Sequence, residues 1–111
     1  MAVLSNLSID QGADYSADIE VQDANGNVAN LANYTVAAQI RKSYSSSTAT
    51  NFTTSITDSA RGIVTIQLSN TTTNGMKAGR YLYDVEITDN AGAKTRVVEG
   101  QITIQPGVTQ T

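Results

Sequence analysis

The 111 residues carry seven basic and ten acidic side chains, for a net charge of −3, and include no cysteine and no histidine. This length fits one domain with one core, and the scattered basic residues lack the clustered stripe that phosphate binding needs, so we expect no nucleic-acid partner. Without cysteine or histidine there are no disulfides, no thiolate metal sites, and no histidine to act as general base.

The chain shows no membrane or export signal. No apolar run approaches the roughly 20 residues that cross a bilayer, and residues 1–5 lack the basic start and long apolar core of a signal peptide. We therefore expect a complete product, made in the cytoplasm, without a membrane partner.

The N-terminal third predicts three strands. A short strand covers residues 4–9, and a clearer one covers 15–21, where apolar and polar side chains alternate with a period of two. The Asn25-Gly26 step predicts a tight turn, because both residues tolerate positive φ. A third strand then follows over residues 34–41. Each of these strands has one apolar face.

The middle of the chain continues this pattern. Residues 42–51 are rich in serine and threonine and predict a flexible loop or an edge crossing, because strand alternation resumes over 52–56. Another strand follows over 63–68, with its apolar residues on one face. Residues 70–76 predict a single helical turn that crosses between sheets.

The strand over residues 80–88 is the most informative segment. Tyr81 and Tyr83 alternate with polar residues, and Gly79 permits a backbone conformation that a Cβ would resist. The pattern Ala-Gly-x-Tyr-x-Tyr is typical of the start of strand F in immunoglobulin-like sandwiches. We expect Tyr81 to form a tyrosine corner, and Tyr83 to fill the core where antibody domains carry a cysteine.

The C-terminal part completes an all-β protein. A hairpin over 89–92 leads into a strand over 95–104, and Pro106-Gly107 ends it. About seven strands at this spacing predict an immunoglobulin-like antiparallel β-sandwich, although a small jelly roll or an open barrel shares the pattern. We expect one domain over residues 1–105 and a polar, mobile tail over 106–111.

Catalytic and metal-binding patterns are weak. Asp84 and Glu86 share a strand face, as paired catalytic carboxylates would, but a solvated polar face explains them as well. Calcium ligands are conceivable near turns, but the Asp-x-Asp-x-Asp-Gly loop is missing, and turn chemistry favours aspartate at the same places. We therefore expect no enzyme, cofactor or metal. The aspartates near turns are Asp10, Asp14, Asp23, Asp58 and Asp89.

The candidates for partner contact lie on loops and polar strand faces. Arg41, Lys42 and Tyr44 begin the serine-rich segment, and Leu82 and Val97 are apolar residues on otherwise polar faces. The competing interpretation of each is an ordinary exposed side chain. Exposed edge strands offer a further route to partners, because they can extend a neighbour's sheet.

Taken in order, the turns and strands resemble a known group of proteins. Between about residue 9 and about residue 109, the chain is similar to small virion proteins of tailed bacteriophages, in particular the immunoglobulin-like N-terminal domain of baseplate upper proteins and short neck, tail or head accessory proteins. The motifs are Gln11-Gly12-Ala13-Asp14-Tyr15, Asp23-x-x-Gly26, Leu31-x-x-Tyr34, Gln39-Ile40-Arg41, Gly62 before Val-x-Ile-x-Leu, Gly79-x-Tyr81-x-Tyr83-Asp84-Val85, Gly100 and Thr109.

The resemblance implies a structural, non-enzymatic attachment role within a virion, with other virion structural proteins as partners. The resemblance leaves open whether the chain also forms homo-oligomers. The chain has no receptor-binding or trimerisation extension of the kind found in baseplate upper proteins, which favours an accessory or capsid decoration role over host recognition. Many copies docked on a virion lattice would gain strength through avidity.

An adhesion module is the alternative. A carbohydrate or cell-surface binding domain, with or without calcium, uses the same sandwich but displays aromatic rings that stack on sugars. Here the tyrosines fall mostly on the inward phase of their strands.

Overall fold

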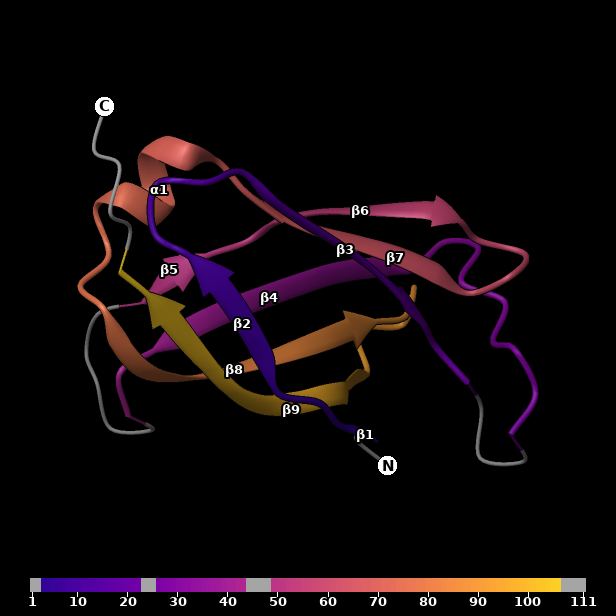
Figure 1. The fold of residues 1–111 in the computed structure, drawn as a ribbon. Helices are drawn as coiled ribbons and strands as arrows, with labels where there is room; N and C mark the ends of the chain where they lie inside the picture. The colour runs from indigo at the N-terminus through magenta and orange to yellow at the C-terminus, as the bar shows by residue number, and fades with distance from the viewer. Residues whose placement is uncertain (1–2, 23–25, 44–48, 107–111) are drawn as a thin grey trace.

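The computed structural model describes residues 3–22, 26–43 and 49–106. Within these residues the chain forms nine strand segments and one short helix (Figure 1). The elements in chain order are β1 (Val3–Leu4), β2 (Leu7–Asp10), β3 (Tyr15–Glu20), β4 (Thr35–Arg41), β5 (Thr50–Asn51), β6 (Thr53–Asp58), β7 (Ile63–Leu68), α1 (Asn70–Asn74), β8 (Gly79–Thr88) and β9 (Lys94–Gln105).

The strands form two sheets that pack against each other. One sheet has the order β1-β9-β8-β4-β5, with β2 also on β9, and the other has the order β3-β7-β6. Both layers are visible in Figure 1, with α1 at one end. The predicted all-β sandwich is confirmed. Its seven predicted strands correspond to nine segments, because β1 and β2 share one edge, and β5 and β6 follow each other across two sheets.

The N-terminal edge differs from the prediction in two ways. The strand expected over residues 4–9 is split, because Asn6 uses its side-chain Oδ1 to accept the Gln101 N–H at 3.1 Å, in place of a backbone ladder. Both pieces also run parallel to β9, with Val3 beside Val98 and Leu7 beside Ile102, in a sandwich whose other pairings are antiparallel among the described residues.

The chain changes sheet between β5 and β6. Thr50 and Asn51 pair with β4, the Phe52 N–H donates to the Ala38 carbonyl at 3.0 Å, and Thr53 already belongs to the opposite sheet. Phe52 is buried at this crossing. The segment predicted as a loop or an edge crossing therefore ends in a crossing. Residues 44–48 of that segment lie outside the described residues.

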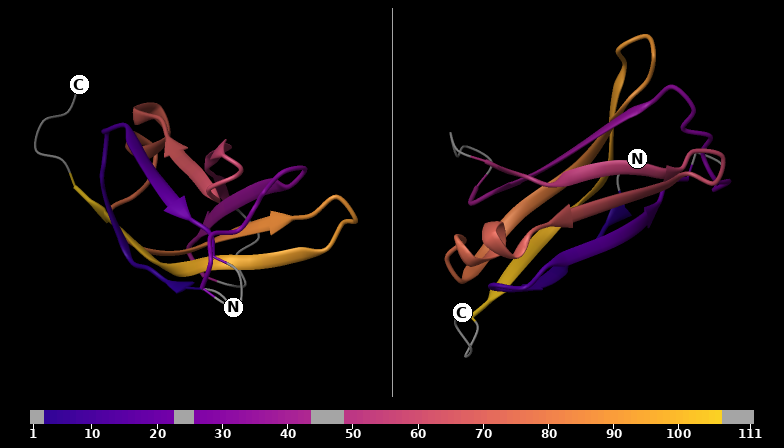
Figure 2. Two further views of the ribbon diagram at one scale, coloured as in Figure 1. Left: turned by 90° about the vertical axis from the view of Figure 1, so that its right-hand side faces the viewer. Right: turned by 90° about the horizontal axis from the view of Figure 1, so that it is seen from above.

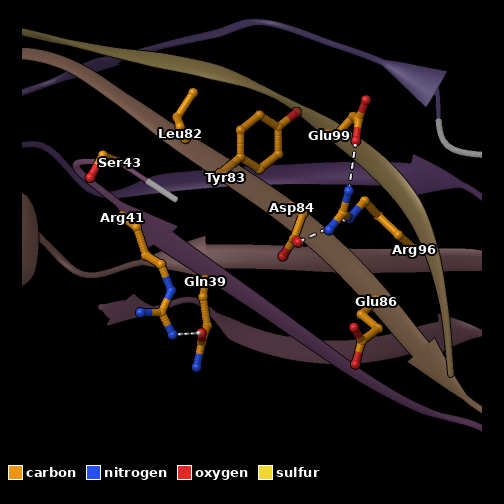
Figure 3. A pocket seen from close by; sticks show the side chains of 9 residues that line it. All are labelled: Gln39, Arg41, Ser43, Leu82, Tyr83, Asp84, Glu86, Arg96 and Glu99. Carbon is orange, nitrogen blue, oxygen red and sulfur yellow. Dashed lines mark hydrogen bonds and ion pairs between the residues drawn. The ribbon is translucent and has the colours of Figure 1, made fainter. Parts of the chain in front are cut away.

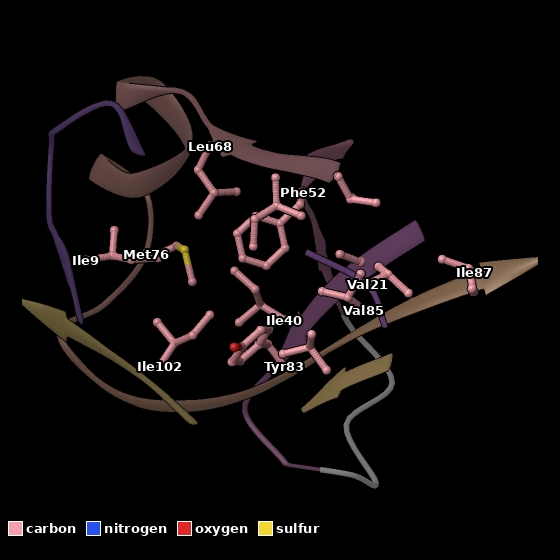
Figure 4. Close-up of a cluster of buried hydrophobic side chains, with 14 of the residues drawn as sticks. Ile9, Val21, Ile40, Phe52, Leu68, Met76, Tyr83, Val85, Ile87 and Ile102 are labelled. Carbon is pink, nitrogen blue, oxygen red and sulfur yellow. The ribbon is translucent and has the colours of Figure 1, made fainter. Parts of the chain in front are cut away.

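One hydrophobic core fills the space between the sheets (Figure 4). The alternation of the strands supplies it, because every second residue of β7, β8 and β9 turns inward. One end of the core is covered by α1 and the residues around it, including Met76 and the fully buried Thr73. The helix begins after Ser69, whose Oγ accepts the Thr72 N–H, and it is the single turn that the sequence predicts. The innermost side chains include Ile9, Leu31, Ile40, Val64, Ile66, Val85, Ile102 and Ile104.

The last strand, β9, ends at Gln105. Pro106 follows as an exposed residue, and residues 107–111 of the predicted tail lie outside the described part of the chain.

Candidate functional site

Tyr81 makes the contact expected of a tyrosine corner. Its hydroxyl donates to the backbone carbonyl of Lys77, four residues upstream, at 2.7 Å. Gly79 enters the strand with φ at 140°, a value that other residues rarely adopt. Lys42 covers the corner, with its Nζ 4.7 Å from the centre of the Tyr81 ring and 3.1 Å from the Arg80 carbonyl that accepts its hydrogen bond.

Tyr83 lies in the core, two residues further along. Its side chain is 5% exposed, and its ring meets Phe52 edge-on with 6.2 Å between the ring centres. The hydroxyl donates to the backbone carbonyl of Ser5 at 2.7 Å. Burial raises the pKa of the Tyr83 phenol. Tyr83 therefore fills core volume and also holds the N-terminal edge strand.

Two predicted contact residues meet on the outer face of the six-stranded sheet. Arg41 of β4 and Leu82 of β8 are directly opposite each other in the ladder, and both line an open groove with a volume of about 370 Å³. We call this the outer groove (Figure 3). The residues that line it are Gln39, Arg41, Ser43, Leu82, Tyr83, Asp84, Glu86, Arg96 and Glu99.

The other predicted contacts lie elsewhere. Lys42 is exposed but sits over the tyrosine corner. Val97 occupies a β-bulge, because the register moves from Val85 opposite Val98 to Glu86 opposite Arg96, and its half-buried side chain packs against the core. Tyr44 and the serines that follow it lie outside the described residues.

Charged and polar side chains organise the outer groove. Arg96 bridges two carboxylates, with Nε 3.2 Å from Asp84 Oδ2 and Nη1 3.1 Å from Glu99 Oε2 (Figure 3). On the other side of Leu82, Arg41 donates to Gln39 Oε1 at 3.1 Å. These side chains are partly exposed, so their ion pairs stabilise the fold only weakly. Their arrangement presents charges of both signs around one apolar residue.

Asp84 and Glu86, the candidate carboxylate pair, are both engaged by cations. Asp84 meets Arg96, and Glu86 Oε1 is 3.9 Å from Lys94 Nζ. Each carboxylate thus has its own partner on β9. The arrangement suits fixed surface charges and hydrogen bonds to a neighbour.

The aspartates near turns accept backbone hydrogen bonds. Asp14 accepts the Asn70 N–H at 2.7 Å, Asp58 the Arg61 N–H at 3.2 Å, and Asp89 the N–H groups of Ala91 and Ala93 at 2.9 Å. Within the described residues, no three carboxylates converge to hold a metal ion. Asp10 is exposed, and Asp23 is not among the described residues.

Sequence reasoning missed Gln39, Arg96 and Glu99 as members of the groove. Their polar alternation is visible along each strand, but only the register between strands brings them together. The register itself depends on the bulge at Val97, which no sequence signal indicates.

The fold and site define a two-sheet β-sandwich with a charged groove on the outer face of one sheet. No protein-family model matches the chain, and no curated protein matches it. Solved structures that it resembles include an internalin-like protein of Listeria monocytogenes, at 17% identity and a TM-score of 0.46, and a family 123 glycoside hydrolase of Clostridium perfringens, at 14% identity and a TM-score of 0.42.

Each likeness covers 96% of this chain, but only 28% of the internalin-like protein and 23% of the glycoside hydrolase. The chain therefore spans less than a third of either protein, and neither likeness bears on its activity. Among the described residues, no helix has the length and apolar character needed to cross a membrane.

Proposed function

We propose that this chain is a non-enzymatic structural or accessory protein of a tailed-phage virion, which docks on the neck, tail, baseplate or capsid through the outer groove. The observation that carries the proposal is the pairing of Arg41 with Leu82 across the β4–β8 ladder, in one open groove. The ordered motifs that resemble phage virion proteins supply the setting.

The outer groove has the chemistry of a docking surface. Leu82 provides an apolar centre, and Arg41, Asp84 and Arg96 provide a polar surround, which is the usual anatomy of a protein interface. Charges of both signs fix the orientation of a partner more than they add affinity. Repetition on a symmetric particle then converts a modest contact into stable attachment.

The ion pairs of the groove support a non-enzymatic role. A general acid or base must be able to reach the proton that it transfers. Asp84 and Glu86 are instead engaged by Arg96 and Lys94 on β9. We infer that they serve as fixed charges for recognition.

Particle composition tests the setting. Mass spectrometry of purified virions should find this chain at a fixed ratio to the capsid or tail proteins. Its absence from every particle, with no capsid or tail genes beside its own gene, would refute the virion role.

Add-back to particles that lack the chain tests the docking face. We expect purified wild-type protein to rebind, and Arg41→Glu and Leu82→Asp variants to rebind at least about tenfold more weakly, as for residues near an interface centre. Arg61→Glu is the matched control. Arg61 is exposed in the turn before β7, and the substitution changes the charge by the same amount as Arg41→Glu. Equal rebinding of all variants would exclude the outer groove.

A carbohydrate or cell-surface adhesion module is the second candidate. The observation in its favour is the convergence of amide, carboxylate and guanidinium groups from Gln39, Asp84 and Arg96, which can pair with sugar hydroxyls. Glycan-array binding that disappears in a Glu99→Gln variant would support it. A melting temperature that rises in millimolar calcium and falls again with EDTA would identify its calcium-dependent form.

A further inference from the structure

The three-stranded sheet ends in an open edge at β3. This strand pairs with β7 from Tyr15 opposite Leu68 to Glu20 opposite Ile63, and no strand of the described residues pairs with its far side. In many immunoglobulin-like sandwiches the first strand occupies this place. Here β1 and β2 lie on β9 instead, and Figure 2 shows this N-terminal segment in indigo following yellow β9. The sheet is thus one strand short.

The backbone of β3 presents hydrogen-bonding groups at this edge. Val21, just after the strand, donates its N–H toward the β7 side, to the Gly62 carbonyl at 2.8 Å. Backbone groups alternate in direction along a strand, so those of Ser16, Asp18 and Glu20 point to the open edge. An extended segment could form a ladder with them.

An apolar groove lies beside the open edge. It has a volume of about 250 Å³ and opens between β2 and β3, with Leu7, Ala17 and Ile19 among its walls and the buried side chains of Ile66, Tyr83 and Val98 beneath. Ala17 and Ile19 are half-buried, because they pack against the core on one side and line this groove on the other. Side chains of an added strand that point inward would fill this groove.

The rim of the edge is acidic. Asp14, Asp18 and Glu20 are exposed. Each accepts a hydrogen bond through one oxygen, from Asn70, Thr65 and Gln22 respectively, but none of them forms an ion pair within the described residues. Cross-strand neighbours of opposite charge stabilise a ladder, and like charges destabilise it. The outward side chains of an added strand should therefore be basic.

The same charges disfavour a second copy of this chain as the occupant. An antiparallel pairing of two β3 strands that keeps their apolar faces together centres on Ala17 or on Asp18. The first register places Asp14 opposite Glu20, and the second places Asp18 opposite the partner copy's own Asp18. Both bring carboxylates together, so self-pairing is opposed by repulsion.

We propose that β3 accepts an added strand from a different protein, an extended segment in which apolar residues alternate with lysine or arginine. The apolar side chains enter the groove between β2 and β3, and the basic ones meet Asp14, Asp18 and Glu20. This inference goes beyond the proposed function, because it concerns another surface and holds whether or not the chain belongs to a virion.

A synthetic peptide tests the proposal. The probe has about eight residues, the length of an ordinary strand, with valine and lysine in alternation. A matched probe carries glutamate in place of lysine. We expect the basic probe to bind saturably below ~1 mM, more weakly at high salt, and the acidic probe to bind at least about tenfold more weakly. Amide NMR shifts should map to Ser16, Asp18 and Glu20.

Two variants separate the contribution of backbone hydrogen bonds to probe binding from the contribution of charge. Ser16→Pro removes an N–H that points away from β7, and Asp18→Lys reverses a rim charge, so each should weaken the basic probe about tenfold or more. Asp58→Lys makes the same charge change on β6, at the opposite side of the three-stranded sheet and outside both grooves, and should leave binding unchanged. Circular dichroism shows whether each variant folds. If Ser16→Pro does not fold, the comparison of Asp18→Lys with its control tests the proposal.

Four results would overturn the proposal. They are no saturable binding by the basic probe, equal binding of both probes, equal loss in Asp18→Lys and Asp58→Lys, and amide shifts confined to the outer groove. Virion composition affects none of them, so this test and that of the proposed function fail independently.

Discussion

The strands β9 and β3 differ in how many neighbouring strands they pair with, and the N-terminal segment accounts for the difference. β9 is paired on both sides, with β8 along its length and with β1 and β2 on its far side, whereas β3 is paired on one side only. The N-terminal segment can cover one sheet or the other but not both. By joining β9 it extends the six-stranded sheet and leaves β3 at an edge of the three-stranded sheet.

Specific contacts hold the N-terminal segment on β9. The Ser5 N–H donates to the Glu99 carbonyl at 2.8 Å, and the Ser5 carbonyl accepts the Tyr83 hydroxyl. Gly100 makes this approach possible, because a Cβ at this position would lie 2.0 Å from the Ser5 carbonyl oxygen. The N-terminal segment can therefore approach β9 at this point only because Gly100 has no side chain.

Hydrogen exchange should show the largest difference between the two strands. Consecutive amides of β9 around Ile102 face a partner on one side or the other, so we expect all of them to be protected. In β3 the amides of Ala17 and Ile19 face β7, but those of Ser16 and Asp18 face the open edge. We expect these last two to exchange about 10³-fold faster than their neighbours. Uniform protection along β3 in the free protein would contradict an open edge.

Gly100→Ala should have the next largest effect. The new methyl group cannot coexist with the Ser5 carbonyl, so β1 and β2 must shift, at a cost of about 2–3 kcal/mol in the free energy of unfolding. Gly75→Ala is the control, because Gly75 has φ at −82° and its nearest neighbours would be 3.6 Å from a Cβ. Urea denaturation measures both. Equal stability of the two variants would contradict the close approach.

Removing the tyrosine hydroxyls should separate the two tyrosines. Tyr83→Phe breaks a hydrogen bond in the core and leaves the Ser5 carbonyl without its donor, so we expect a loss of about 1–1.5 kcal/mol. Tyr81→Phe breaks a more exposed bond to the Lys77 carbonyl, which water can replace, so we expect about 0.5 kcal/mol. Thermal or urea unfolding of both variants measures the difference. A larger loss in Tyr81→Phe would show that the corner, rather than the N-terminal contact, holds this region.

The sequence predicts the sandwich well because its strands have clear alternation. The inward phase of Tyr83, Val85 and Ile87 follows from a period of two, and the helical turn follows from Ser69 as its cap. What the sequence does not predict is pairing between distant segments. Nothing local to residues 3–10 indicates which sheet they join, because that depends on Gly100, about ninety residues later.

The candidate site was also only partly predicted, because it too depends on pairing between distant segments. Arg41 and Leu82 were predicted as contact residues one by one, but their direct pairing and the company of Arg96 depend on register. The open edge of β3 was equally hidden, because a half-buried strand alternates in the same way with one neighbour or two. Contacts that join distant segments thus limit the prediction of this site.

Alkaline pH should give the smallest effect. Burial raises the pKa of both Tyr83, near the N-terminal segment, and Tyr15, at the open edge. The unfolded chain ionises first, near pH 10, so the stability that these neutral phenols provide is complete below about pH 10 and is lost as the pH rises through their folded values. Urea midpoints at about pH 9 and about pH 11 should fall less in Tyr83→Phe and in Tyr15→Phe than in the wild type. Identical falls of the urea midpoint in all three proteins would mean that neither ring is shielded from water. A smaller fall in Tyr83→Phe alone would place the Tyr15 ring in solvent, and the open edge at β3 would then extend to its first residue.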